Sequence, residues 1–289
     1  MPELPEVETV RAALEPHLLG RRIDRADILD TRLTRPVEPG AVAAELADER
    51  VAAVERRGKY LVVRFVSGRA LLVHLRMTGS FRWGPDGTVD DDPHRRAVVS
   101  LDDGSDVAYR DVRRFGTWLL LEPGELEPYL AVRLGPEPLS DAFTPAFLRA
   151  RLSGRRAPLK AALLDQRTVA GLGNIYADEA LWRASLHPRR VAGGLRRGEL
   201  ERVHASLREA LEVGIARQGS TLRDYRQPDG SSGAMQEEFK AYGRLGEPCE
   251  RCGTPIDRIV VGGRGTWYCP RCQRLGSRAR HARPVAGPR

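Results

Sequence analysis

Four cysteines near the C-terminal end of the 289-residue chain constrain its fold more than any other feature. They form two Cys-x-x-Cys pairs separated by sixteen residues, and they are the only cysteines in the sequence: Cys249, Cys252, Cys269 and Cys272. Two pairs at this separation suit one tetrahedral Zn²⁺, with a β-hairpin between the pairs. Unrelated reduced thiols and a redox role for either pair are the alternatives. We expect a structural zinc finger whose folding depends on the metal.

The charge of the chain is distributed unevenly. Lys plus Arg total 47 and Asp plus Glu total 39, which gives a net charge of +8. Residues 1–135 hold 20 basic and 23 acidic side chains, and residues 136–289 hold 27 basic and 16 acidic ones, so −3 and +11 sum to +8. Four zinc-bound thiolates would lower the net charge only to about +6. A basic half joined to a near-neutral half favours a polyanionic partner.

The composition and the first residues exclude several classes of protein. With 41% apolar and 30% charged residues, the chain can bury cores and is not globally disordered. It contains no apolar run of about eighteen residues, so we expect no transmembrane helix and no membrane partner. The acidic start lacks the basic and apolar regions of a signal peptide. We therefore expect a cytoplasmic protein.

The apolar pattern of the first part predicts a helix followed by strands. Helical spacing covers residues 6–18, and an exposed loop is expected over residues 84–96. Segments rich in Val and Leu predict strands at 51–57, 59–66, 69–77, 97–101, 106–110 and 117–121. The fold class is therefore α+β, and residues 1–134 form an N-terminal, largely antiparallel β-sandwich with flanking helices.

The rest of the chain has a different texture. Residues 135–144 are rich in Pro and form the predicted hinge, and residues 145–240 form a predicted helical domain with a loop at 220–234. Helical spacing in that domain covers 145–153, 157–165, 177–184 and 197–218. Residues 241–274 hold the zinc finger. Residues 275–289 are rich in Arg and Pro without an apolar pattern, so we expect a disordered tail.

Two glycine-rich sites could bind phosphate. Gly171 and Gly173 permit a tight turn before Asn174, which can cap the following helix, and free N–H groups at a helix start bind phosphate. Arg264 lies between two glycines at the tip of the predicted hairpin, where a rigid finger could present it to a phosphate. Plain turn chemistry at the first site and a solvated arginine at the second are the alternatives.

Pro2 gives the N-terminus a chemistry of its own. Removal of Met1 would expose a secondary amine, and an α-amino group has a pKa of about 7.7–8.0. The neutral fraction of that amine could attack an acetal or aldehyde carbon and form an iminium. Glu3 beside it could relay a proton. An ordinary start sequence is the alternative that chemistry alone leaves open.

The N-terminal sequence resembles the start of the formamidopyrimidine-DNA glycosylase (Fpg) family. The resemblance continues in the same order to about residue 274, through Arg57–Leu61, His74–Gly79, Arg113–Gly116, Leu134–Leu139, Gly171–Glu179, Tyr242–Arg244 and the four cysteines. It implies a β-sandwich, a helix-two turn-helix domain and a zinc finger. It also implies a bifunctional base-excision repair enzyme, which removes oxidised purines from damaged double-stranded DNA and cleaves the abasic strand by β- and δ-elimination. We expect a monomer.

The resemblance assigns four catalytic roles. Pro2 is the nucleophile at the sugar C1′, and Glu3 is the general acid that assists opening of the sugar ring. Lys59 matches the lysine of β-elimination and phosphate contact, and Arg264 matches the finger arginine of δ-elimination. Only three lysines stand among the 47 basic residues. A retained lysine can transfer a proton, whereas arginine is effectively never deprotonated.

A second group of residues is expected to bind the DNA. A lesion inside a duplex cannot reach an N-terminal amine, so its nucleotide must be flipped out and the hole filled. Met77, Arg113 and Phe115 match the family's void-filling residues. Five further residues match positions that contact DNA or its phosphates: His94, Arg155, Lys160, Asn174 and Tyr242.

Three positions differ from many family members. Val112 stands where Pro often precedes the paired arginines, and the lesion loop reads Gly233-Ala-Met-Gln236 where Gly-Tyr-Phe is common. Leu4, in place of Gly, favours the Fpg branch over the endonuclease VIII branch, which prefers oxidised pyrimidines. An endonuclease VIII-like enzyme and a zinc-ribbon DNA-binding protein without catalysis are the alternative functions.

Overall fold

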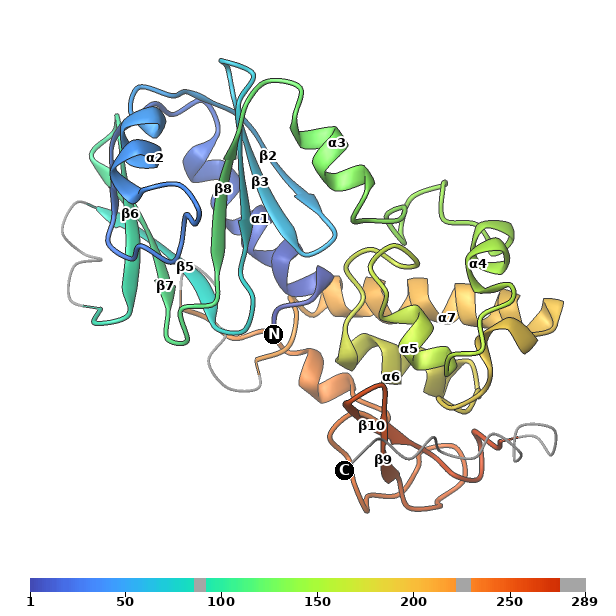
Figure 1. Cartoon of the computed structure of the whole chain (residues 1–289). Helices are drawn as coiled ribbons and strands as arrows, with labels where there is room; N and C mark the ends of the chain where they lie inside the picture. The colour runs from blue at the N-terminus through green and yellow to red at the C-terminus, as the bar shows by residue number, and fades with distance from the viewer. Residues whose placement is uncertain (86–91, 222–229, 276–289) are drawn as a thin grey trace, which may run out of the picture. The chain divides into compact units, whose positions relative to one another are not determined.

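The computed structural model describes residues 1–85, 92–221 and 230–275, and the chain divides into two compact units. The first unit contains residues 1–134 and 213–237, and the second contains residues 135–212 and 238–289. Figure 1 labels the helices and strands of both units. None of the described helices combines the length and apolarity needed to cross a membrane.

The first unit is built on two four-stranded antiparallel sheets. One sheet has the order β1 (Ile23–Ile28), β6 (Arg95–Leu101), β7 (Ser105–Asp111) and β5 (Gly79–Pro85). The other has the order β2 (Val51–Arg57), β3 (Tyr60–Phe65), β4 (Ala70–His74) and β8 (Thr117–Leu121). Three helices accompany the sheets: α1 (Leu4–Leu18), α2 (Pro39–Leu46) and α3 (Leu126–Ala131).

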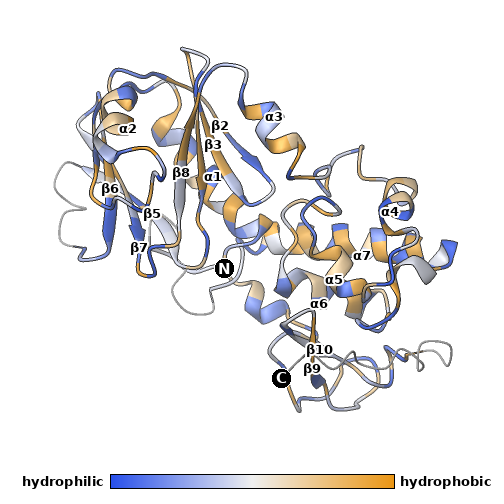
Figure 2. Ribbon diagram, viewed as in Figure 1, coloured by the Kyte–Doolittle hydropathy of each residue, from blue (hydrophilic) through white to orange (hydrophobic). Residues whose placement is uncertain are grey.

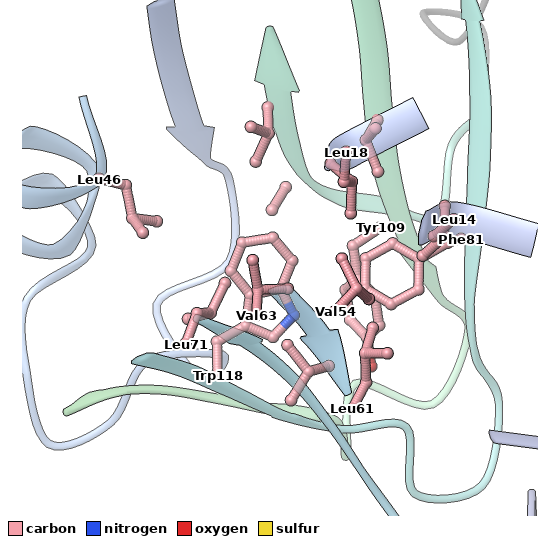
Figure 3. Close-up of a cluster of buried hydrophobic side chains, with 14 of the residues drawn as sticks. Leu14, Leu18, Leu46, Val54, Leu61, Val63, Leu71, Phe81, Tyr109 and Trp118 are labelled. Atoms are coloured by element: carbon pink, nitrogen blue, oxygen red, sulfur yellow. The ribbon is translucent and has the colours of Figure 1, made fainter. Parts of the chain in front are cut away.

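One buried cluster joins the facing sides of both sheets. Figure 3 shows Val54, Leu61 and Trp118 from one sheet with Phe81 and Tyr109 from the other. Burial of each such side chain contributes roughly 1.5–3 kcal/mol to folding. The sandwich strands carry both hydrophobic and hydrophilic residues (Figure 2), as expected of strands with one face in a core. This cluster forms the core of a β-sandwich.

Helix α1 closes one side of that core and begins at the predicted catalytic residues. Its buried apolar residues recur at helical spacing and belong to the same cluster: Val7, Val10, Leu14 and Leu18. Glu3 is the N-cap residue, and a reciprocal capping box joins Glu3 and Glu6. This arrangement satisfies backbone N–H groups that a helix start leaves without intrahelical partners. Packing and capping together fix where the N-terminus lies.

The second unit consists of helices and a β-hairpin. The helices are α4 (Pro145–Leu152), α5 (Leu159–Leu163), α6 (Asn174–Arg183) and α7 (Arg197–Ala216), whose last residues belong to the first unit. Strands β9 (Asp257–Val261) and β10 (Arg264–Tyr268) pair antiparallel, and β10 packs on α6. Gly262 and Gly263, both at positive φ, form the two-residue turn between them. Such a turn suits the twist of a tight hairpin.

The predicted α+β class, with its sandwich, helical domain and hairpin, is confirmed. The sequence did not predict β1, β5, α2 or α3, and the loop expected over residues 84–96 was wrong at both ends. Gly84 and Pro85 end β5, and Arg95 and Arg96 begin β6, because both pairs add to the ladder with β7. Residues 222–229 and 276–289, which include most of the predicted lesion loop and tail, lie outside the described residues.

Candidate active site and metal centre

The N-terminus is anchored by two buried acidic residues. Pro2 is buried, and Glu3 and Glu6 are only 3% and 2% exposed. The backbone N–H of Glu3 donates to Oε2 of Glu6 at 2.9 Å. This bond holds the residue after Pro2 in a fixed conformation, since the acceptor belongs to the first turn of α1.

The other carboxylate oxygen of Glu6 holds a segment more than 200 residues further along the chain. The backbone N–H and the hydroxyl of Ser220 donate to Oε1 at 2.8 and 3.0 Å. Gly219 lies so close that a Cβ atom there would be 2.8 Å from Cγ of Glu6. Ser220 also bridges to Ala234. Glu6 therefore joins the N-terminus to the residues that flank the predicted lesion loop.

Lys59 lies in the turn between β2 and β3 and is nevertheless buried, at 6% exposure. Arg56 holds this turn against α1, because its Nε donates to Glu8 at 3.0 Å and its Nη1 donates to the carbonyl of Gly58 at 3.1 Å. Gly58 has φ +59°, which supplies the tight turn. The fold thus brings Lys59 to the side of the sandwich that α1 covers.

Four charged side chains act on the N-terminal amine. Burial lowers the pKa of the Met1 α-amine, the charges of Glu3 and Glu6 oppose this shift, and those of Lys59 and Arg113 add to it. A lowered pKa keeps more of an amine neutral near pH 7, and a neutral amine is the nucleophilic form. Once Met1 is removed, the amine of Pro2 would stand beside the same groups.

One buried carboxylate organises the turns that carry the predicted void-filling residues. Asp111 is 1% exposed and accepts the hydroxyl of Thr78 and the backbone N–H groups of Arg113, Phe115 and Gly116. The bonds from the last two N–H groups measure 2.9 and 2.7 Å. Thr78 follows Met77, so the same carboxylate positions all three predicted void-filling residues. Asp111 was not predicted as a functional residue, although it directly precedes the Val-Arg-Arg motif.

The two neighbouring arginines of that motif point to different partners. Arg114 has φ +57°, and its guanidinium binds Asp30 through two hydrogen bonds of 2.6 and 2.8 Å. Arg113 is exposed, and its guanidinium carbon lies 4.8 Å from the ring centre of Phe115. Met77 and Phe115 are 36% and 51% exposed. The structure thus leaves the three predicted void-filling side chains accessible.

Close to Lys59, the buried His74 is held neutral. Burial, together with the positive charges of Arg76 and Lys59, lowers its pKa to about 3. The backbone N–H of Arg76 donates to Nδ1 of His74 at 3.0 Å. His74 therefore acts as a hydrogen-bond acceptor across the physiological pH range.

Of the predicted DNA-binding residues, His94 and Arg155 are partly exposed. The backbone carbonyl of His94 accepts a bond from the N–H of Asp111, so His94 belongs to the same edge of the sandwich as the turns of the predicted void-filling residues. Arg155, in the second unit, forms an ion pair of 3.1 Å with Asp165.

Lys160 was expected to contact DNA, but its side chain is fully buried. Its Nζ forms a 2.7 Å ion pair with Asp178 and donates to Gly265 O and Thr266 Oγ1. Burial raises the pKa of Asp178, and the charge of Lys160 opposes that rise. Asn174 begins α6 and donates to the same carbonyl of Gly265 at 3.0 Å. In this structure both residues hold the hairpin that carries Arg264, which is itself exposed.

Glu179, also missed as a functional candidate, fixes the chain before the zinc finger. It is fully buried and accepts the backbone N–H groups of Lys240, Ala241 and Tyr242 at 2.9–3.0 Å. The ring of Tyr242 packs 4.5 Å from that of Trp267. A signal was available, because Asp178 and Glu179 are acidic residues in an otherwise apolar helical stretch.

The four cysteines converge as a metal site. Their Sγ atoms all lie within 4.8 Å of one another, and those of Cys252 and Cys269 are 3.5 Å apart. Zinc–sulfur bonds of about 2.3 Å place tetrahedral thiolates roughly 3.8 Å apart, so the four thiols fit one Zn²⁺. Arg251, which lies between Cys249 and Cys252 in the sequence, donates to the carbonyls of Trp182 and Arg183 at the end of α6. The metal site is thereby tied to the helix that carries Asp178.

Comparison with known proteins decides the family. The family model of the formamidopyrimidine-DNA glycosylase N-terminal domain matches residues 1–118, and that of its H2TH domain matches residues 134–226. A zinc finger found in FPG and IleRS matches residues 246–275. The chain belongs to the formamidopyrimidine-DNA glycosylase family. The four cysteines of this family member form its zinc finger, and zinc is its structural metal.

Individual Fpg proteins are similar over nearly the whole chain. The formamidopyrimidine-DNA glycosylase of Symbiobacterium thermophilum is 49% identical, with 94% of this chain and 89% of that protein covered. The MutM (Fpg) structure from Thermus thermophilus has a TM-score of 0.85 at 45% identity, covering 95% of this chain and all of that one. The Lactococcus lactis Fpg in complex with DNA containing an abasic site has a TM-score of 0.88 at 37% identity, with 94% and 100% covered.

Removing zinc should unfold the β9–β10 hairpin. The cluster around Cys249 and Cys269 includes Trp182 and Trp267, so loss of the metal should change tryptophan fluorescence. A metallochromic dye should count one zinc released per chain during treatment with a chelator, and added zinc should restore the signal. Absence of metal from the purified protein, or an unchanged spectrum after its release, would contradict this prediction.

Acid should destabilise the protein through His74, and His74→Gln should remove that part of the pH dependence. In the unfolded chain histidine binds a proton below pH about 6.5, whereas folded His74 stays neutral down to about pH 3. Stability is therefore lost as the pH falls through 6.5, by about 2 kcal/mol at pH 5.0. Urea unfolding of both proteins at pH 7.5 and 5.0 measures the difference. The same loss in both proteins would refute this role of His74.

Proposed function

We propose that this protein excises oxidised purines, such as 8-oxoguanine and formamidopyrimidines, from double-stranded DNA and then cleaves the abasic strand. As a member of its family it is a DNA glycosylase of base-excision repair. The observation that carries the specific proposal is the N-terminus, where Pro2 and Glu3 are buried and the charge of Lys59 acts on the N-terminal amine. A Lactococcus lactis relative has been solved with abasic DNA, which supports an abasic intermediate here.

In the first step, the bond between C1′ and the damaged base is replaced by a bond between C1′ and the nitrogen of Pro2. After Met1 is removed, the neutral nitrogen of Pro2 attacks C1′ of the flipped nucleotide, the bond between C1′ and the base breaks, and the base leaves with the proton that the attacking nitrogen gives up. Glu3 donates a proton to the ring oxygen, the sugar opens, and an iminium remains between Pro2 and C1′. The charge of Lys59 lowers the pKa of the Met1 α-amine, and beside the amine of Pro2 it would likewise favour the neutral, nucleophilic form.

Two eliminations follow from the iminium. Loss of a proton from C2′ breaks the C3′–O bond and releases the strand on the 3′ side, and we assign this step to Lys59. Loss of a proton from C4′ to water then breaks the C5′–O bond and leaves a phosphate, and we assign to Arg264, which keeps its own proton, the binding of that departing phosphate. Water finally hydrolyses the iminium and frees the amine of Pro2.

The remaining residues would hold the distorted DNA. We propose that Met77, Arg113 and Phe115 fill the space left by the flipped nucleotide, since their side chains are accessible and Asp111 fixes their turns. We further propose His94, Arg155, Asn174 and Tyr242 as contacts to DNA or its phosphates. The zinc would stabilise the hairpin of Arg264 and take no part in the reaction.

The domain limits and the location are also proposals. We propose a catalytic domain of residues 1–134, a hinge of 135–144, a helix-two turn-helix domain of 145–240, a zinc finger of 241–274 and a tail of 275–289. The matched ranges of the family models support this division. Because the proposed substrate is chromosomal DNA, we propose a cytoplasmic, nucleoid-associated location. We also propose that the enzyme is a monomer.

Pro2→Gly should suppress base excision and leave DNA binding intact. The change removes the secondary amine, while phosphate contacts come from other residues. We expect excision of 8-oxoguanine to slow by about two orders of magnitude, the scale of one well-placed catalytic group. Borohydride should trap a covalent complex with the mature wild-type protein and far less with the variant. If the wild-type protein binds the duplex but yields no trapped complex, the proposed mechanism is wrong.

Lys59→Arg should impair strand cleavage although it keeps the positive charge. Arginine cannot release its proton near neutral pH, so β-elimination should slow while affinity for DNA changes little. Lys240→Arg is the matched control, because Lys240 forms a partly exposed ion pair of 3.0 Å with Glu250 that arginine can also make. Gel analysis of cleavage on a duplex with a preformed abasic site measures the step. Normal cleavage by Lys59→Arg would remove Lys59 from the mechanism.

A further inference from the structure

A buried ionic cluster lies beneath the hairpin that carries Arg264. Lys160 on α5 and Thr266 on β10 are fully buried, and Asp178 on α6 is 1% exposed. All three belong to the second unit. Lysine and aspartate are rarely buried to this degree unless they are paired, because removing a charge from water is costly.

Lys160 makes one ion pair and two hydrogen bonds, and together they use three different partners. Its Nζ lies 2.7 Å from Oδ1 of Asp178, 3.1 Å from the carbonyl of Gly265 and 2.9 Å from the hydroxyl of Thr266. An ammonium group carries three N–H bonds and no acceptor. Lys160 therefore connects α5, α6 and β10 at one point.

Asp178 extends this connection along β10. Its Oδ2 accepts the backbone N–H of Trp267 at 3.1 Å. The pair of Lys160 and Asp178 thus binds three consecutive residues of the strand, the first of which directly follows Arg264. The hydroxyl of Thr266 also donates to the carbonyl of Arg264 at 3.0 Å.

The tip of the hairpin is fitted to the same helix. A Cβ atom at Gly262 would lie 3.2 Å from Cβ of Ala161, so the turn before Arg264 packs directly on α5. A second contact on α5, next to Lys160, therefore limits sliding of the hairpin. The exposed side chain of Arg264 starts from a backbone that is fixed on both sides.

We propose that the buried pair of Lys160 and Asp178 is a positioning device that sets the place of Arg264 for δ-elimination. Apolar residues could fill the same space and contribute as much stability, but they would not fix the register of a strand by directed bonds. The inference rests on the proposed role of Arg264. Neither Lys160 nor Asp178 needs to touch the DNA for this purpose.

Asp178→Asn tests the proposal, because asparagine keeps the size and an acceptor for Trp267 but loses the charge. On a duplex with 8-oxoguanine under single-turnover conditions, we expect excision and β-elimination to continue. The ratio of δ- to β-elimination product should fall by about tenfold to a hundredfold, the scale of a displacement of about 1 Å in an active site. This ratio does not depend on the fraction of active enzyme, so general destabilisation would leave it unchanged.

Three further variants make the result specific. Asp257 lies on the same hairpin, but it accepts a hydrogen bond from Tyr268 and does not pair with Lys160. Asp257→Asn should therefore leave the ratio of δ- to β-elimination product unchanged. Thr266→Val should also lower the ratio of δ- to β-elimination product. It provides the test if Asp178→Asn fails to retain zinc. The double variant Lys160→Met/Asp178→Leu removes both charges and leaves neither partner unpaired. It should fold, but its ratio of δ- to β-elimination product should be as low as that of Asp178→Asn.

Arg264→Ala separates the two ideas. If it abolishes the δ product while Asp178→Asn and Thr266→Val leave the ratio at the wild-type value, the positioning role of the pair is overturned and the proposed function stands. If Arg264→Ala itself leaves the ratio unchanged, Arg264 does not act in δ-elimination, and both the assignment and this inference fail. A wild-type ratio in the doubly neutral variant would also overturn the need for the ion pair.

Discussion

A carboxylate that is removed from water must be surrounded by donors, and this requirement shapes every part of the candidate site. Glu6, Asp111, Asp178 and Glu179 are all buried, and each accepts hydrogen bonds from backbone N–H groups. In each case at least one donor comes from a distant part of the sequence or from a turn that would otherwise lack regular structure. None of these four acids is itself proposed to act on the DNA.

The division of labour between the units follows from the same principle. In the first unit, the sandwich core places α1, and two buried acids then fix the N-terminus and the turns of the proposed void-filling residues. The second unit has a small hairpin with few apolar residues of its own. Its conformation depends on four thiolates around zinc and on polar bonds to α5 and α6. An apolar core makes the first unit rigid, whereas a metal and directed hydrogen bonds make the hairpin of the second unit rigid.

Strong local signals predicted much of the fold. The spacing of the cysteines predicted the hairpin, and apolar periodicity predicted α1 and most sandwich strands. Strand β1 was missed because Asp24, Arg25 and Asp27 interrupt its apolar pattern, and α2 was missed because Pro39 and Gly40 resemble a turn. Helix packing and sheet pairing override such weak propensities.

The candidate site was predictable only in part. Pro2, Glu3 and Lys59 could be named because their chemistry or a family motif is local. The burial of Lys160 could not be predicted, since its partners lie 18 residues away in Asp178 and more than 100 residues away in the hairpin. No local pattern encodes such a contact, and lysine is normally a surface residue. Glu6 was missed for the same reason, since Ser220 is more than 200 residues away, whereas Asp178 and Glu179 carried a local signal as acidic residues in an otherwise apolar helical stretch.

The shared carboxylate of Asp111 has a mechanical consequence. Because one side chain holds both the turn after Met77 and the turn of Arg113 and Phe115, the two turns form one rigid wedge. In the proposed void-filling role, such a wedge would enter a duplex as a unit and would not adapt to the sequence around the lesion. Such an enzyme would scan DNA by how readily each base step yields, so the flexibility of the DNA, more than the protein's own, would decide where it pauses.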